Sequence, residues 1–293
     1  MSEVILGFDH PVVAVRDMDA SRKCYENLGF VVPPRGSHIE WGTGNWCIMF
    51  PDDYIELRGI LDASRYTHHL DSFLADREGL MGVAFTTPVA EDGYKRLRAV
   101  GVDAVEPREL TRNFELTEGW VKPRFKIVFI PEDAAPGLMA PLVIEHLTPE
   151  LLRRADWLEH PNDARSVRSM TAVVEDVAQA RVAYRKLFGD SQVDELDGCL
   201  RVSVGRGGHV YVTTEKGLER LHGVPAFEPM PEPPYLAAMT INVGDLGRTM
   251  AALEQNGVPA EAVGADLIRV APQHTCGAVL EFIVDGASGS LRN

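Results

Sequence analysis

Apolar runs bounded by turn residues alternate with amphipathic stretches from the start of the chain. The run His10-Pro-Val-Val-Ala-Val15 predicts a strand, and Asp17 is a suitable N-cap for a helix that Gly29 ends. A second run, Tyr54-Ile-Glu-Leu57, predicts a short strand with a carboxylate at its centre. This order is typical of a βαβββ unit, in which the first and last strands can face each other across a curled sheet.

The opening pattern recurs three more times. Residues 170–189 repeat residues 12–29, with the N-cap aspartate and a helical tyrosine aligned. Weaker copies occupy residues 81–101 and 239–257, and each again predicts a strand, a helix and a glycine stop. A spacing of about 70 to 85 residues exceeds the roughly 20 to 50 of solenoid repeats. The pattern therefore indicates duplication of a whole βαβββ module.

Shifts in composition predict where the modules are joined. Residues 62–77 are polar and residues 224–234 are rich in proline, so we expect them to connect modules within a domain. Residues 148–165 have no strand pattern and are expected to separate two domains. The predicted organisation is a first domain at 1–150, a linker at 151–166 and a second domain at 167–286.

Composition and charge limit the classes of partner. The chain has 293 residues, 45% of them hydrophobic, which suffices for two domains with buried cores. The net charge is −14 and no basic cluster resembles a phosphate-binding footprint, so we expect no nucleic-acid partner. Without a signal-peptide pattern or an apolar run near the roughly 20 residues of a membrane span, we expect a cytoplasmic protein. The four cysteines have no zinc-ligand spacing and are expected to be reduced and packed.

Short motifs accompany the first two modules: Asp9-His10, Gly36-Ser-His38, Gly42-Thr-Gly-Asn45, Tyr54-Ile-Glu-Leu57, Glu145-His146-Leu-Thr-Pro-Glu150 and His160-Pro-Asn162. With the fourfold repeat, they resemble the vicinal oxygen chelate superfamily, and most closely its glyoxalase-like members with tandem βαβββ modules. The resemblance implies an α+β fold whose four modules pair into two glyoxalase/bleomycin-resistance/dioxygenase-like domains with curled mixed sheets. It also implies a divalent metal (Fe, Mn, Zn, Ni or Co) in a cavity between paired modules.

The resemblance also suggests which residues bind that metal. Ligands in the superfamily come from the first and last strands of each module, which assigns His10 and Glu56 in the first module. The first strand of the second module has no ligating side chain, whereas its last strand offers Glu145 and His146, which face opposite sides of a regular strand. We favour His146 as the third ligand, and Glu145 is then a candidate catalytic base. A plain strand-entrance histidine and an outward-facing glutamate are the alternative interpretations of His10 and Glu56.

The second domain has few residues of these types. The positions aligned to His10 lie near Ser169 and Ala238, and of the last-strand positions only Glu281 has a ligand-type side chain. We therefore expect the second domain to lack a metal and to be structural, a lid or a surface for assembly of a homo-oligomer.

Other polar residues of the first domain are candidates for contact with a substrate. His38 lies among glycines that permit a close approach to a ligand, so it is a candidate acid or base, with a surface turn as the alternative. Asn45 and Tyr54 are weaker candidates for lining the pocket. Arg112 and Arg124 flank strands of the second module, and either could bind a carboxylate with two hydrogen bonds; surface solvation is the alternative. We expect Arg124 to be the substrate-binding one.

These residues support three hypotheses for function. The first is a metal-dependent lyase or isomerase that acts on a small hydroxy-carbonyl or aromatic hydroxy-ketone through an enediolate-like intermediate. The second is an Fe(II)-dependent dioxygenase with a site of two histidines and one glutamate. The third is a non-catalytic small-molecule binding or resistance protein.

Overall fold

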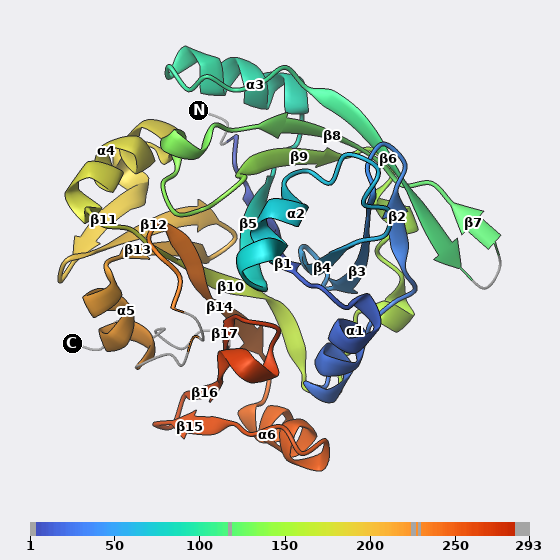
Figure 1. Ribbon diagram of the computed structural model, residues 1–293. Helices are drawn as coiled ribbons and strands as arrows, with labels where there is room; N and C mark the ends of the chain where they lie inside the picture. Colours follow the sequence, from blue (N-terminus) through green and yellow to red (C-terminus); the bar gives the residue numbers. More distant parts are fainter. Residues whose placement is uncertain (1–3, 117–118, 224–226, 228–229, 285–293) are drawn as a thin grey trace.

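The computed structural model describes residues 4–116, 119–223, 227 and 230–284, and in these residues the chain forms two curled sheets (Figure 1). The first has the strand order β2-β3-β4-β1-β5-β9-β8-β6-β7, and an additional pairing of β2 with β6 closes it into a barrel. The second has the order β11-β12-β13-β10-β14-β17-β16-β15. The predicted α+β fold with paired βαβββ modules is confirmed.

The first domain contains two modules and a connecting helix. Its elements are β1 (Gly7–Ala14), α1 (Met18–Asn27), β2 (Gly36–His38), β3 (Thr43–Met49), β4 (Tyr54–Ile60), α2 (Leu70–Asp76), β5 (Gly79–Thr86), α3 (Ala90–Ala99), β6 (Arg108–Leu116), β7 (Gly119–Val121), β8 (Arg124–Phe129) and β9 (Leu142–His146), with a 3₁₀ turn at Glu132–Ala134.

The second domain repeats this order. Its elements are β10 (Ala164–Val173), α4 (Val177–Phe188), β11 (Val193–Leu196), β12 (Cys199–Gly205), β13 (Gly208–Thr213), α5 (Glu215–His222), β14 (Tyr235–Val243), α6 (Leu246–Gln255), β15 (Glu261–Val263), β16 (Leu267–Val270) and β17 (Val279–Val284), with 3₁₀ turns at Asp190–Gln192 and Pro272–His274. Among the described helices, none is long and apolar enough to cross a membrane.

The repeated helices begin in the same way in three of the four modules. The side chains of Asp17, Asp176 and Asp245 accept hydrogen bonds from backbone N–H groups in the first turns of α1, α4 and α6, as the sequence predicts for N-caps. Helix α3 of the second module begins after Val89, which cannot cap it. There the Glu145 carboxylate of β9 accepts a hydrogen bond of 2.8 Å from the N–H of Ala90.

The segment between the two sheets packs closely against the first domain. It contains 3₁₀ turns at Pro149–Leu151 and Ala155–Trp157, and β10 begins at Ala164. His160 is buried there: its Nδ1 accepts a hydrogen bond of 3.0 Å from Val31 N–H, and its Nε2 lies 3.0 Å from Met49 O. Its ring contacts Phe30 and Phe50 edge-on. Both ring nitrogens are thus engaged by the neutral form.

We expect this histidine to make the fold sensitive to acid. Burial lowers the pKa of His160 from 6.5 to about 4, so between these values the unfolded chain binds a proton that the folded chain does not. The stability that neutral His160 contributes is fully present above pH 6.5 and is lost as the pH falls. Urea unfolding at pH 7.5 and 5.0 should show about 2 kcal/mol less pH-dependent loss in His160→Gln than in the unmodified chain. Equal losses would contradict this origin.

Candidate functional site

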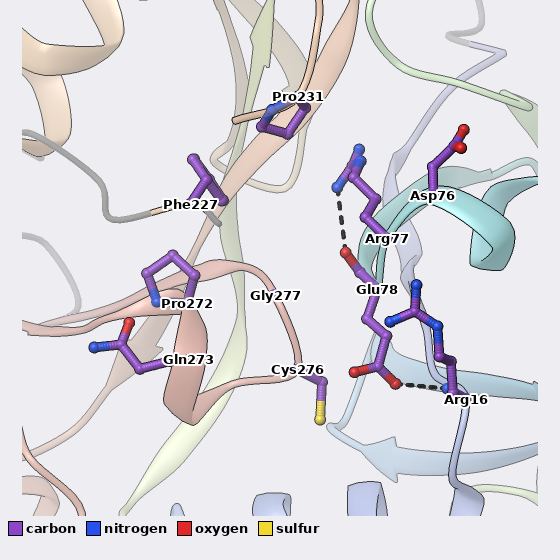
Figure 2. A pocket seen from close by; sticks show the side chains of 10 residues that line it. All are labelled: Arg16, Asp76, Arg77, Glu78, Phe227, Pro231, Pro272, Gln273, Cys276 and Gly277. Atoms are coloured by element: carbon purple, nitrogen blue, oxygen red, sulfur yellow. Dashed lines mark hydrogen bonds between the residues drawn. The ribbon is translucent and has the colours of Figure 1, made fainter. Parts of the chain in front are cut away.

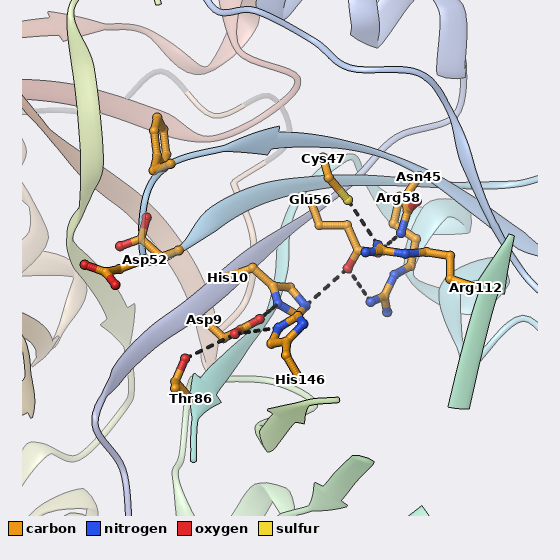
Figure 3. Close-up of polar contacts among 12 residues, drawn as sticks. Asp9, His10, Asn45, Cys47, Asp52, Glu56, Arg58, Thr86, Arg112 and His146 are labelled. Carbon is orange, nitrogen blue, oxygen red and sulfur yellow. Dashed lines mark hydrogen bonds and ion pairs between the residues drawn. The ribbon is translucent and has the colours of Figure 1, made fainter. Parts of the chain in front are cut away.

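A buried polar cluster inside the first barrel begins with neighbouring residues of β1. The register of β1 against β5 slips between Phe8 and His10, and such a bulge can turn two successive side chains toward the same side. The Asp9 carboxylate lies 2.7 Å from His10 Nδ1 and 2.9 Å from His146 Nε2, and it accepts a hydrogen bond of 3.1 Å from the Thr86 hydroxyl (Figure 3). Asp9 was not predicted, because strand alternation alone places it opposite His10.

Electrostatic interactions favour the charged forms of Asp9 and His10. Burial by itself would raise the pKa of Asp9, but the charge of His146 and the hydrogen bonds from His10 and His146 lower it far below its ordinary value. Burial would lower the pKa of His10, yet its contacts with Asp9 and Glu56 raise it above 6.5. An imidazolium between two carboxylates is the form that these contacts stabilise.

Glu56 of β4 is the centre of the cluster and is 1% exposed. One carboxylate oxygen accepts a hydrogen bond of 2.5 Å from the Asn45 amide and lies 3.7 Å from His38 Nε2. The other accepts a hydrogen bond of 2.5 Å from Arg58 and lies 3.4 Å from His10 Nε2. Although burial opposes ionisation, Arg58 and His10 hold the pKa of Glu56 well below its usual range. The inward orientation expected for Glu56 agrees with this placement.

His38 and Tyr54 complete the cluster. His38 ends β2, is 6% exposed, and places Nδ1 2.8 Å from the Thr43 hydroxyl. Burial, with the nearby charges of Arg58 and Arg112, lowers its pKa to about 3, so its ring is neutral near pH 7. The Tyr54 ring stacks on His10 with centroids 4.4 Å apart. The structure therefore brings together six of the predicted site residues: His10, His38, Asn45, Tyr54, Glu56 and His146.

Two predicted site residues lie outside the cluster. Glu145 faces the opposite side of β9 from His146 and caps α3 through Ala90, so its position does not favour the catalytic role expected for it. Arg124 is exposed and donates a hydrogen bond of 2.7 Å to Glu109 on the neighbouring strand. The alternative interpretation of Arg124, a solvated surface residue, agrees better with this position.

Arg112 of β6 lies inside the barrel. The pairing that closes the barrel sets Arg112 opposite His38, and the arginine is only 2% exposed. Its guanidinium donates a hydrogen bond of 3.1 Å to the Cys47 thiol, and Nε has no partner. Within the described residues, no carboxylate forms an ion pair with it. The alternation of apolar residues in β6 could have indicated this position. Leu110 and Phe114 lie on the same face of the strand as Arg112, and both are buried.

Several other buried polar atoms of this region lack hydrogen-bond partners within the described chain. They are Asn45 Oδ1, Arg58 Nε and His68 Nδ1, in addition to Arg112 Nε. Buried polar groups are normally paired, so these atoms are available to bond to water or to a ligand. A recess beside His10 and Arg58 offers about 10 Å³, close to the minimum for one water, so a larger ligand can enter only if neighbouring side chains move. The Trp41 ring stacks on His68 at 4.7 Å and covers this side.

The predicted metal ligands do not converge as a metal site. His10 Nε2 and Glu56 face each other, but His146 Nε2 is turned to Asp9. No group of three or more His, Cys, Asp or Glu side chains within the described residues is placed to hold a metal ion. The guanidinium of Arg58 also donates a hydrogen bond to the Glu56 carboxylate, which a bound cation would need as a ligand. This donor set does not fit a divalent cation as arranged, because an arginine already neutralises its central carboxylate.

Comparison with known proteins identifies the family. The model of the glyoxalase-like domain matches residues 8–188, which include the barrel except for its first residue, and the start of the second domain. The chain belongs to this glyoxalase-like family, within the vicinal oxygen chelate superfamily. None of the curated proteins searched matches the chain.

Solved structures share the family's two-domain fold over almost the whole chain. A hypothetical protein from Staphylococcus aureus has a TM-score of 0.68 at 14% identity, with 95% of this chain and 99% of that chain covered. A xylose isomerase-like TIM barrel/4-hydroxyphenylpyruvate dioxygenase fusion protein has 0.63 at 14%, covering 97% and 49%. A mutant of 4-hydroxymandelate synthase from Streptomyces coelicolor has 0.58 at 10%, covering 96% and 92%. At these identities the comparisons show a common fold, and they do not show that the proteins share a reaction.

Proposed function

We propose that the first barrel binds a small oxygenated carboxylate and acts on it as a lyase or isomerase by acid–base chemistry, without a metal. Arg112 is the observation that carries this proposal. It is a buried cation whose described hydrogen-bond acceptor is a thiol. The charge of Glu56 acts on it, but Glu56 is already paired with Arg58 and His10, and a buried charge without an ion-pair partner of its own is costly. A substrate carboxylate would supply two acceptors and the missing negative charge.

Proton transfer in this proposal belongs to the histidines beside Glu56. His10 has a raised pKa and is the proton donor, with Asp9 fixing its orientation. The pKa of His38 is lowered by burial and also by the charges of Arg58 and Arg112. A bound carboxylate would cancel the charge of Arg112, which is a smaller cause than burial, and this would raise the pKa of His38 in part. His38 is the proton acceptor in this proposal, and the nearby guanidinium groups would stabilise an enediolate-like intermediate.

The test uses 2-oxo and 2-hydroxy carboxylates and their uncharged amides. Carboxylates should raise the unfolding temperature of the protein and the amides should not. For a bound substrate, NMR in D₂O should show enzyme-dependent exchange of the proton on the carbon next to the carbonyl. Binding without exchange for any member would support the non-catalytic alternative instead. Failure of every carboxylate to bind would overturn the proposal.

Elemental analysis separates this chemistry from the two metal-dependent hypotheses. We expect the purified chain to hold far less than one metal ion per molecule, and its unfolding temperature to be unchanged by a chelator. A stoichiometric metal whose removal lowers that temperature would instead favour His10, Glu56 and His146 as ligands, either for a metal-dependent lyase or isomerase or for a dioxygenase.

A further inference from the structure

A cavity of about 430 Å³ lies between the two domains and has none of the residues of the polar cluster in its lining (Figure 2). Arg16 and Arg77 of the first domain line one side, and the loop that precedes β17 lines the other through Cys276 and Gly277. The backbone N–H of Arg16 donates a hydrogen bond of 2.6 Å to Glu78 at this wall. Junctions between domains are common places for small molecules to enter.

The thiol of Cys276 lines this cavity, and a second thiol lies nearby. Cys276 is the neighbour with the largest influence on the pKa of Cys24 of α1, and neither cysteine is fully buried. The two residues come from different domains, although the sequence suggests isolated, packed cysteines. The contact is therefore a product of domain packing.

Backbone contacts on both sides hold the two thiols together. The Cys24 thiol donates to the carbonyl of His274 at 3.2 Å, and the neighbouring Tyr25 hydroxyl donates to that of Thr275 at 3.3 Å. Gly277 packs so closely that a Cβ there would lie 2.7 Å from the carbonyl oxygen of Glu78. The loop is thus docked on α1 and beside the start of β5 through residues on both sides of Cys276, which holds Cys276 near Cys24.

We propose that Cys24 and Cys276 form a reversible disulfide between the two domains when a peroxide enters this cavity. The thiolate of one cysteine attacks the O–O bond of hydrogen peroxide, which gives a sulfenic acid and hydroxide. The thiol of the other then attacks that sulfur, the S–S bond forms, and water leaves. Two electrons pass from the cysteines to the peroxide, and the thiol proton is carried off in the water.

The two thiols are not equivalent before oxidation. The proximity of Cys276 is the main cause of a lowered pKa at Cys24, and burial and the charge of Glu78 oppose it only in part. Thiolate character promotes attack on a peroxide. Cys47 and Cys199 are buried, and burial raises the pKa of each to about 11. Selective oxidation of the Cys24 and Cys276 pair is the expected result.

The experiment treats the full-length reduced chain with hydrogen peroxide and then counts its thiols after denaturation. The unmodified chain should fall from four thiols to two, and dithiothreitol should restore four. Peptide mapping without reductant should find the Cys24–Cys276 cross-link. Oxidation should also raise the unfolding temperature by several degrees, because the cross-link closes a loop that spans most of both domains.

Matched serine variants separate this proposal from general oxidation. Cys199→Ser, which removes a buried thiol, should still lose two thiols, from three to one, with the same cross-link. Cys276→Ser should form no intramolecular cross-link, and a sulfenic acid trapped by dimedone should appear at Cys24. An unmodified chain that keeps four thiols, or whose cross-link involves Cys47 or Cys199, would overturn the proposal.

Discussion

Replacing Arg112 by methionine is expected to stabilise the ligand-free protein while removing its affinity for carboxylates. Methionine fills much of the same volume and removes a buried charge that no carboxylate pairs within the described residues. Because apolar replacement of buried charges is often neutral or stabilising, we expect a gain of about 1–2 kcal/mol in the free energy of unfolding. The same change should weaken carboxylate binding by roughly 100-fold, since a charge-assisted pair of hydrogen bonds is lost.

Arg124→Met is the matched control for this prediction. Arg124 is exposed and its ion pair with Glu109 is solvated, so its replacement should change the free energy of unfolding by less than about 0.5 kcal/mol. Carboxylate binding should be unchanged in it. Urea unfolding and calorimetric titration measure the two effects. An Arg112→Met protein that is destabilised and still binds carboxylates normally would show that Arg112 is structural.

Arg112→Met is expected to raise stability and to lower carboxylate affinity, and these opposite effects distinguish a ligand-binding role from a structural one. If Arg112 served only packing, its replacement would lower the stability of the protein. If it serves to bind a ligand, it can lower the stability of the ligand-free protein, and its replacement then raises that stability. Addition of a saturating carboxylate should therefore reverse the order of stability, because binding stabilises only the unmodified chain. This reversal requires no knowledge of the reaction that follows binding.

Much of the fold could be predicted because its signals are local and repeated. Each module is marked by a strand, a helix and a glycine stop, and in three of the four modules an aspartate N-cap precedes the helix and forms its cap. The same order of strands and helix placed His10 and Glu56 on the first and last strands of one module. These strands are parallel neighbours, with Val12 paired to Glu56, so the two residues meet for a reason visible in the sequence.

The remaining residues depended on contacts between distant segments. Asp9 enters the cluster through a bulge that forms where β1 meets β5. Arg112 stands opposite His38 only because β6 closes the barrel against β2. Glu145 is turned outward and caps a helix whose own N-cap, Val89, has no suitable side chain. Pairing register and barrel closure are set by long-range packing, which a strand's own pattern does not specify.

Glu56→Gln is expected to cause the largest loss of stability in the first domain. The carboxylate is buried between Arg58 and His10 and lies near His38. Its neutralisation leaves the buried charges of Arg58 and His10 without this counter-charge, and breaking a buried pair in this way costs about 3–5 kcal/mol. In a chain of this size that corresponds to a fall of roughly 10 °C in the unfolding temperature. Glu109→Gln, at an exposed ion pair, should change it little.

The stability difference between the unmodified chain and Glu56→Gln should depend on pH in a direction set by the pKa of Glu56. The folded-state pKa of Glu56 lies well below 4.5 because of Arg58 and His10, so its contribution to stability is complete above that value. As the pH falls below about 4.5, Glu56 takes up a proton in the unfolded chain first, and its contribution is progressively lost. The stability difference between the unmodified chain and Glu56→Gln should therefore shrink in acid. It should also decrease as the pH rises above 6.5, because Glu56 raises the pKa of His10 and the stability from that pair is lost as His10 loses its proton. A difference that stays constant into acid would mean that glutamine disturbs packing rather than charge, and the ionic network around Glu56 would then not be what holds the cluster together.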